Sequence, residues 1–292
     1  MPLTGVIPEA YLTIAAAATV FTVMFDVGLG VVVGEFAWVW RRPALVAKAL
    51  FSVLIAVPAI ALAVVHAFDL SRAAEIGIVL MAVSPGAPVA LRRSLDAGGH
   101  RSFAPALQIM VAMLAVVSMP LWIAALNEFY GGRASIDPRE LARQVFVAQL
   151  LPLSLGMLAR RVLPRAADRL QRPMTRTANA LLIALTILVL IDVLGSIVDA
   201  GWRIASAIVI ITALALTVGH SLGGVDRATR SAIAISSAAR NPGLALLVAA
   251  LNRAPAEIHA TILAYLLVSA LTVLGYVIWR RRAAARASSG MP

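Results

Sequence analysis

Two short motifs combine residues that break a helix with polar groups that could bind an anion. The first is Ser84-Pro85-Gly86-Ala87-Pro88, and the second is Arg240-Asn241-Pro242-Gly243. Proline removes a backbone donor and glycine favours non-helical backbone, so each motif should interrupt a helix and leave amides and carbonyls unpaired. The second motif also carries a guanidinium and an amide, which donate hydrogen bonds to carboxylates. Together the motifs could therefore form a binding site for an organic anion.

The composition is that of a helical membrane protein. Hydrophobic residues make up 61% and charged residues 13% of the 292 residues, against roughly 45–50% and ~25% in a soluble domain. The net charge is +11, but the basic residues lie in short connectors beside apolar runs, which is typical of membrane topology rather than of nucleic-acid binding. The chain has no cysteine, so disulfides and thiolate metal sites are excluded. We expect a lipid bilayer as its environment, no nucleic-acid partner and no bound cofactor.

Nine apolar stretches are long enough to cross a bilayer as helices. They lie near residues 9–32, 43–66, 73–96, 102–126, 141–162, 177–198, 203–220, 229–251 and 256–279. The third and the eighth contain the two motifs. Within a bilayer such breaks are tolerated only where the freed backbone groups face protein or a polar cavity. Matching breaks in the two halves of a chain indicate the binding site of a secondary transporter.

The basic residues also predict the orientation of the chain. Alternating the connectors between two sides gathers most of the Lys and Arg residues on the side of the C-terminus. The positive-inside rule then predicts a cytoplasmic C-terminus and, because nine is odd, an N-terminus outside. A bias toward Arg and Ala, with Lys48 as the single lysine, suggests a GC-rich bacterial genome. The expected location is therefore the bacterial cytoplasmic (inner) membrane.

A weak internal repeat links the two halves of the chain. Phe25-Asp26-Val27-Gly28-Leu29 in the first span is similar to Ile191-Asp192-Val193-Leu194-Gly195 in the sixth, and Ser84-Pro85-Gly86 is similar to Asn241-Pro242-Gly243. The members of both pairs lie five spans apart. Because five is odd, the two copies cross the membrane in opposite senses. The sequence therefore predicts an inverted-topology repeat whose first copy lacks one leading helix.

Arg240 is open to three interpretations. A charged group near the bilayer centre costs about 2.5–3.5 kcal/mol on insertion scales, so an arginine without a partner is not expected there. It could bind the anionic group of a substrate, helped by the N-terminus of a half-helix that starts near Pro242. It could supply a permanent charge that holds the crossing helices together. It could also pair with Asp26, Asp192 or the carboxyl end of a half-helix.

Other polar residues within the spans each have a structural and a functional interpretation. Asn241, Ser236 and Ser237 could satisfy backbone groups that are freed at the second break, or they could contact a ligand. Gln108 is a lone amide on an apolar stretch. It could form an interhelical hydrogen bond or contact the substrate, and its residue type favours neither role.

Charged residues toward the span ends are interpreted mainly as anchors. Asp26 and Asp192 lie toward opposite ends of their spans, where solvated or paired carboxylates are expected and proton coupling is the alternative. Asp96, Arg92 and Arg93 close the second half of the third span on the cytoplasmic side. The four histidines lie in or near connectors, too scattered for a metal site. No catalytic pair lies at a shared depth, so an intramembrane enzyme is disfavoured.

Several motifs along the chain occur together in one known family. They are Met24-Phe25-Asp26-Val27-Gly28-Leu29, Pro58, Ser84-Pro85-Gly86 leading to Ala97-Gly98-Gly99, and Arg240-Asn241-Pro242-Gly243-Leu244-Ala245-Leu246. With them the chain resembles the bile acid:sodium symporter family from about residue 8 to residue 280. The resemblance implies one transmembrane unit over 1–292, with a panel domain of about 9–32 and 141–198 and a core domain of about 43–126 and 203–280. It further implies that the broken helices cross near the midplane and that the substrates are bile acids, steroid sulfates, keto acids or other organic anions, usually carried with sodium.

The sequence departs from this family at the positions that hold sodium in its symporters. The resemblance assigns those positions to Ser236, Arg240, Ala90, Leu91 and Val53. A hard cation needs about five or six oxygen ligands with some negative charge among them. The residues present here remove a carboxylate and most neutral ligands and add a cation. Sodium coupling through the usual sites is therefore not expected.

The sequence as a whole predicts an all-α polytopic transporter of organic anions, secondary active or facilitative, that works by alternating access. The expected substrate contacts are Arg240, Asn241, Ser236, Ser237, Gln108, Ala87 and Pro88, the expected hinges are Ser84, Pro85, Gly86, Pro242 and Gly243, and the carboxylates available for proton coupling are Asp26 and Asp192. Two alternatives stay open, a sodium symporter with a displaced site and a non-transporting membrane sensor or scaffold. The oligomeric state is left undetermined.

Overall fold

The computed structural model describes residues 9–31, 39–86, 88–129, 137–199 and 201–289, in which every element is a helix. Within these ranges the side chains of some helical residues, among them 88–89, 91–92 and 189–199, lie outside the description. Seven described segments are long and apolar enough to cross a membrane: Ala10–Leu29, Pro43–Phe68, Phe103–Glu128, Pro138–Val162, Gly201–Leu222, Arg227–Leu251 and Ala256–Arg286. The predicted all-α class is confirmed for the described residues.

Five helices are continuous, and two more spans contain a short π-helical turn. The continuous helices are α1 (Glu9–Leu29), α7 (Phe103–Phe129), α10 (Pro164–Asp199), α11 (Gly201–Leu222) and α14 (Ala256–Ser289). The others are α3 (Pro43–Phe51), η1 (Ser52–Ala56) and α4 (Val57–Phe68), and α8 (Pro138–Val145), η2 (Phe146–Leu150) and α9 (Leu151–Val162).

A proline follows each π-helical turn and accounts for it. Pro58 and Pro152 lie at the second position of α4 and of α9. A proline ring clashes with the carbonyl four residues earlier, and a π-helical turn relieves that clash. In η1 the displaced carbonyl of Leu54 accepts a hydrogen bond of 2.7 Å from Nε1 of Trp122 on α7. The neighbouring carbonyl of Val53 is also free to bind a group from another helix.

Two helices are broken at the predicted motifs. The first break separates α5 (Arg72–Ala82) from α6 (Pro88–Asp96), and the second separates α12 (Arg227–Ala238) from α13 (Pro242–Leu251). The predicted third span is therefore divided into two helices that are each too short to cross a membrane alone. The predicted sixth span corresponds to the second half of α10, where many side chains are not described.

Two helices extend well beyond their predicted apolar stretches, α14 at its end and α10 at its start. The sixth span was expected to begin near residue 177, but α10 begins at Pro164 and runs through Pro173. Its first turns carry Arg165, Arg169, Arg172 and Arg176. A search for apolar runs cannot detect such turns, although arginine has a good helix propensity. The residues between 163 and 176 are therefore helix rather than a connector.

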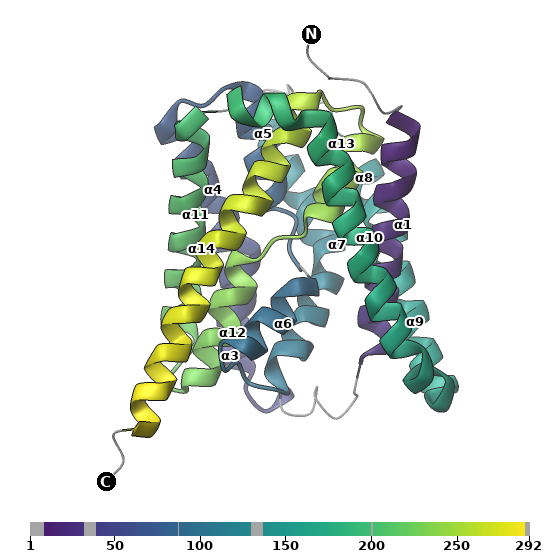
Figure 1. Cartoon of the computed structure of the whole chain (residues 1–292), viewed down its shortest axis with the longest axis vertical. Helices are drawn as coiled ribbons and strands as arrows, with labels where there is room; N and C mark the ends of the chain where they lie inside the picture. The colour runs from purple at the N-terminus through teal and green to yellow at the C-terminus, as the bar shows by residue number, and fades with distance from the viewer. Residues whose placement is uncertain (1–8, 32–38, 87, 130–136, 200, 290–292) are drawn as a thin grey trace.

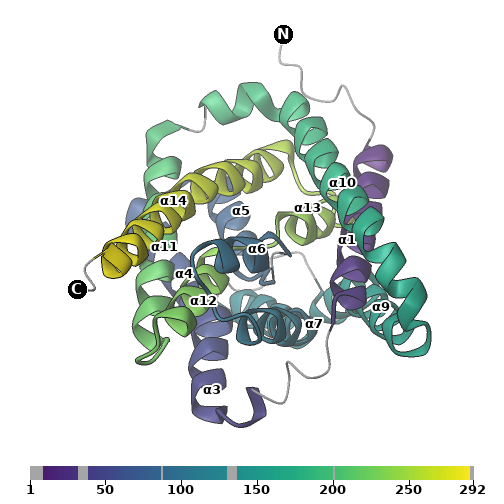
Figure 2. The ribbon, with the colours of Figure 1, turned by 60° about the horizontal axis from the view of Figure 1, so that its bottom comes forward.

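Helices α1, α9 and α10 lie on one side of the molecule, and α11, α12 and α14 lie on the other (Figure 1). On one side α1 packs against α9 and α10, and on the other α11 packs against α12 and α14. Contacts of α1 with α13 and of α10 with α14 join the two sides. Viewed toward one end of the molecule, α6 lies inside the ring of surrounding helices (Figure 2). The start of α1 and the end of α14 lie at opposite ends of the bundle (Figure 1), which agrees with an odd number of crossings.

Candidate functional site

The two helix breaks meet in the interior of the protein. The backbone N–H of Asn241 donates a hydrogen bond of 2.9 Å to the carbonyl of Ser84. Gly86 has a φ of +87°, a backbone conformation that favours glycine. The side-chain Oδ1 of Asn241 accepts from the N–H of Leu244 at 3.1 Å and so caps α13. Pro242 follows at the first position of that helix, where its missing N–H costs nothing. Residues of the two motifs thus stabilise the breaks that they form.

Arg240 binds the backbone around this meeting point. Its Nη1 donates to the carbonyls of Val53 and Ala82, each at 3.0 Å, and its Nη2 donates to the carbonyl of Ser237 at 2.5 Å. Ala82 ends α5, Ser237 lies in the last turn of α12, and Val53 lies in η1. Carbonyls at a helix C-terminus lack intrahelical donors and carry partial negative charge. The guanidinium, on a side chain that is only 4% exposed, therefore joins three interruptions of the helical backbone.

Of the two carboxylates considered for proton coupling, Asp26 has a described side chain and Asp192 does not. Asp26 does not pair with Arg240, because its Oδ1 accepts from Nε2 of Gln171 at 3.0 Å and from Oγ1 of Thr175 at 2.8 Å, both on α10. Arg160 of α9 extends this network by donating to Oε1 of Gln171 at 3.3 Å. The side chain of Asp192 lies outside the described residues.

The remaining predicted contacts are buried at different places. Ser237 shares a hydrogen bond of 2.7 Å with Ser52 through their hydroxyls, and Ser236 is 6% exposed. Gln108 is buried in α7, where its Nε2 has no partner among the described residues. Ala87 and the side chain of Pro88 lie outside the described residues. The structure thus brings together Arg240, Asn241, Ser237 and the two breaks.

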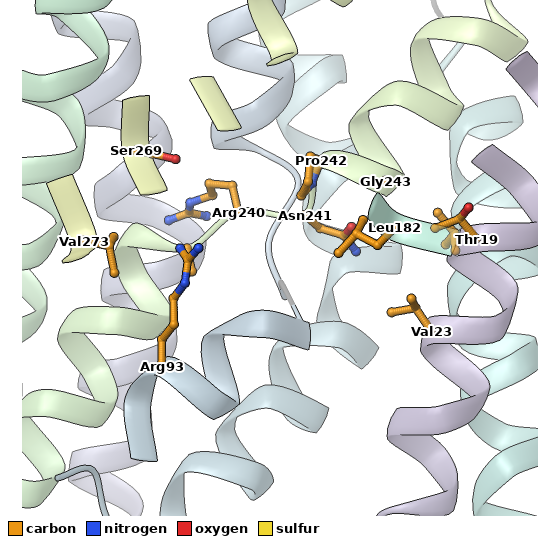
Figure 3. A pocket seen from close by; sticks show the side chains of 12 residues that line it. Thr19, Val23, Arg93, Leu182, Arg240, Asn241, Pro242, Gly243, Ser269 and Val273 are labelled. Atoms are coloured by element: carbon orange, nitrogen blue, oxygen red, sulfur yellow. The ribbon is translucent and has the colours of Figure 1, made fainter. Parts of the chain in front are cut away.

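A cavity of about 50 Å³ lies beside the second break, among residues of α1, α6, α10 and α14 (Figure 3). It is lined by Thr19, Val20 and Val23 of α1, Leu182 of α10, Arg93 of α6, the break residues Ala239, Arg240, Asn241, Pro242 and Gly243, and Ser269 and Val273 of α14. Whole-ligand pockets usually measure about 300–1,000 Å³. In this conformation the cavity therefore has room for a single charged group rather than for a complete organic anion.

The sequence interpretation of Arg93 needs correction. Arg93 was expected to anchor the third span at the cytoplasmic interface, yet its side chain extends from α6 toward Arg240 and lines the cavity (Figure 3). It follows the buried Ala90 by three residues, so both share one face of a helix. That spacing was the available signal, but Arg93 was grouped with Arg92 and Asp96 as an anchor at the end of the span.

The side chains at this crossing do not fit a sodium ion. The carbonyls of Val53, Ala82 and Ser237 converge here and already bind the guanidinium of Arg240. A second cation beside them would be repelled. The lining of the cavity also includes no carboxylate among the described residues, whereas a hard cation requires oxygen ligands with negative charge.

A comparison with protein families gives a match over much of the chain. The family model described as "Sodium Bile acid symporter family" matches residues 17–200, which is more than half of the chain and includes the first break but not the second. No curated protein matches the chain. Members of this family are transporters rather than enzymes, and several apolar helices are present here. The chain is therefore a multi-pass membrane protein that belongs to the sodium bile acid symporter family.

Proposed function

We propose that this protein carries organic anions across the bacterial cytoplasmic membrane by alternating access. The observation that supports this most directly is the cavity, which lies between α1 and α10 on one side and α6, α14 and the second break on the other. Its lining includes two arginines and, among the described residues, no carboxylate. A site between two groups of helices can open to either face when the groups move relative to each other. Its charge favours an anion.

The proposal includes nine crossings in a panel and a core domain. The panel would comprise α1 with α8 to α10, and the core would comprise the remaining helices, including both broken ones. An inverted repeat would relate the two halves of the chain, with the N-terminus outside and the C-terminus in the cytoplasm. The meeting of the breaks through Asn241 and Ser84 supports this arrangement, because inverted repeats bring their discontinuous helices together at one site.

Arg240 acts in this proposal as a fixed cation in place of a coupling ion. Its hydrogen bonds to three carbonyls supply at the crossing the positive charge that a bound sodium ion would bring. A covalently attached cation cannot leave during the transport cycle. Transport therefore proceeds without coupling to sodium at this place, and Asp26 and Asp192 are the carboxylates available for coupling to protons.

The test is initial uptake into proteoliposomes under different cations. Labelled taurocholate and labelled 2-oxoisovalerate represent the bile acids and the keto acids, and external sodium is replaced by choline or potassium at fixed pH. We expect uptake of at least one of these anions above that of protein-free liposomes, at equal rates in all three salts. A saturable requirement for sodium would contradict the fixed-cation role and favour a displaced sodium site. No uptake of either anion under any gradient would favour a sensor or scaffold.

A further inference from the structure

Several hydrogen-bond donors of the cavity have no partner among the described residues. Nδ2 of Asn241 and Nε of Arg240 are buried and unpaired. Arg93 is half-buried and forms no hydrogen bond or ion pair within the described part of the chain. A buried donor without a partner is destabilising. Two such donors and a half-buried guanidinium around one cavity therefore indicate that a ligand with acceptor atoms binds there.

The charges of the cavity lining indicate that this ligand is an anion. The guanidinium of Arg93 extends toward Arg240 (Figure 3), and the described lining contains no carboxylate to offset the two positive charges. Like charges at the edge of a low-dielectric interior repel each other more strongly than they do in water. An anion between them relieves this repulsion, and a neutral ligand does not.

The two arginines are not equivalent. Nη1 of Arg240 uses both of its hydrogens and Nη2 uses one to bind backbone carbonyls, which leaves two of its five donors, Nε–H and one Nη2–H. Arg93 has its whole planar guanidinium available, and this is the group that binds a carboxylate or sulfonate through two parallel hydrogen bonds. Asn241 adds one more donor, since its Oδ1 is used to cap α13 while its Nδ2 is free.

We propose that Arg93, together with Nδ2 of Asn241, binds the anionic group of the transported substrate, and that Arg240 belongs to the frame of the site. This inference rests on the proposed transport function and assigns its substrate recognition to a residue of α6. The rest of the lining is largely apolar, including Val20, Val23 and Val273. The substrate class is therefore an organic anion with one carboxylate or sulfonate on an apolar body.

The absence of cysteine allows a test that needs no knowledge of the natural substrate. A single cysteine replaces Ser269, which lines the cavity from α14, in the full-length protein in liposomes. Its modification rate is measured with 2-sulfonatoethyl methanethiosulfonate, which is anionic, and with the cationic 2-(trimethylammonio)ethyl reagent. The ratio of the two rates reports the electrostatic potential at the site, because any effect on ionisation of the thiol is common to both reagents.

We expect a strong preference for the anionic reagent, which falls on the order of 10-fold in an Arg93→Gln background. Arg93→Lys should keep most of the preference, since it retains the charge. The matched control is Arg101→Gln, which removes an exposed arginine from the connector that follows α6 and should leave the ratio unchanged.

Other results would contradict either the assignment of Arg93 or the proposed transport function. An unchanged ratio in Arg93→Gln would overturn the assignment of Arg93 and leave the transport proposal intact, as would a loss of preference in Arg240→Gln alone. A Ser269→Cys protein that reacts with neither reagent would mean that the cavity does not open to water. That result would overturn alternating access and this inference with it.

Discussion

Arg240 offsets the cost of a buried charge with backbone groups rather than with a carboxylate. Inserting an arginine at the bilayer centre costs about 2.5–3.5 kcal/mol, and hydrogen bonds to a charged group contribute about 1.5–3 kcal/mol each. Three such bonds to carbonyls are sufficient to balance that cost. The carbonyls belong to η1, α5 and α12, so the same bonds stabilise all three helix interruptions.

Replacing Arg240 should therefore lower stability even without ligand. In Arg240→Gln the three carbonyls lose most of their donors, at about 1–3 kcal/mol for each acceptor left unsatisfied. Arg240→Lys should be less harmful, because an ammonium retains the charge and three donors. The measurement is the melting temperature of the purified protein in detergent, with Arg101→Gln as the control for loss of one positive charge. A wild-type melting temperature in Arg240→Gln would contradict the framing role.

The two ends of the Asn241 side chain can be tested separately. Asn241→Ser keeps an oxygen that can cap α13 in place of Oδ1 but removes the free Nδ2, so stability should be close to that of the wild type. Asn241→Ala also removes the cap and should cost about 0.5–2 kcal/mol. Thermal unfolding of both variants distinguishes them. Equal destabilisation by Ser and Ala would show that the cap contributes little and that the amide matters for another reason.

At the scale of elements, α1 and α9 approach so closely that their backbones are in contact. A Cβ atom on Gly28 would collide with the backbone carbonyl of Leu153, and one on Gly156 would collide with that of Phe25. Small residues at a helix crossing allow such close packing in membranes, where van der Waals contact replaces the hydrophobic effect as the driving force. Gly28 therefore serves the packing of α1, within one of the motifs that carry the family resemblance.

We expect Gly28→Ala to separate α1 from α9 and to lower the melting temperature. Gly275 of α14 provides the matched control, since a Cβ there would meet no atom within 4 Å. Gly275→Ala should be neutral or slightly stabilising, because alanine favours a helix by about 1 kcal/mol over glycine. The comparison uses size-exclusion profiles and thermal unfolding of the two variants. Equal behaviour would mean that the α1–α9 crossing relaxes without cost.

The elements that the sequence predicted well are those with a strong local signal. The breaks at Pro85 and Pro242 were predicted because proline and glycine act on the backbone directly. For Arg240, the carboxyl end of a half-helix was one of the three interpretations, and the carbonyls of Ala82 and Ser237 belong to such ends. The carbonyl of Val53 was not predicted as a partner, because it comes from a helix that is distant in sequence. The orientation of Arg93 was missed for a similar reason, since only the packing of α6 inside the helix ring places its side chain in the cavity.

The two ends of the whole molecule differ in charge because the basic residues of the connectors are unevenly distributed. The start of α1 and the end of α14 lie at opposite ends of the bundle (Figure 1). Basic residues concentrate toward the end where α14 finishes, including the turns between α9 and the middle of α10. From the positive-inside rule we predict that this end faces the cytoplasm. Because α10 begins at Pro164, Arg165 lies at its first turn.

Single cysteines at Arg165 and Arg133 test this topology in a chain that otherwise contains none. In intact cells a membrane-impermeant maleimide should label Arg133→Cys and not Arg165→Cys, while both should react after permeabilisation. The expectation follows from the positive-inside rule and from an odd number of crossings. If both positions were labelled from the same side, an even number of spans would separate them. The proposed inverted repeat would then fail, because its two copies must cross the membrane in opposite senses.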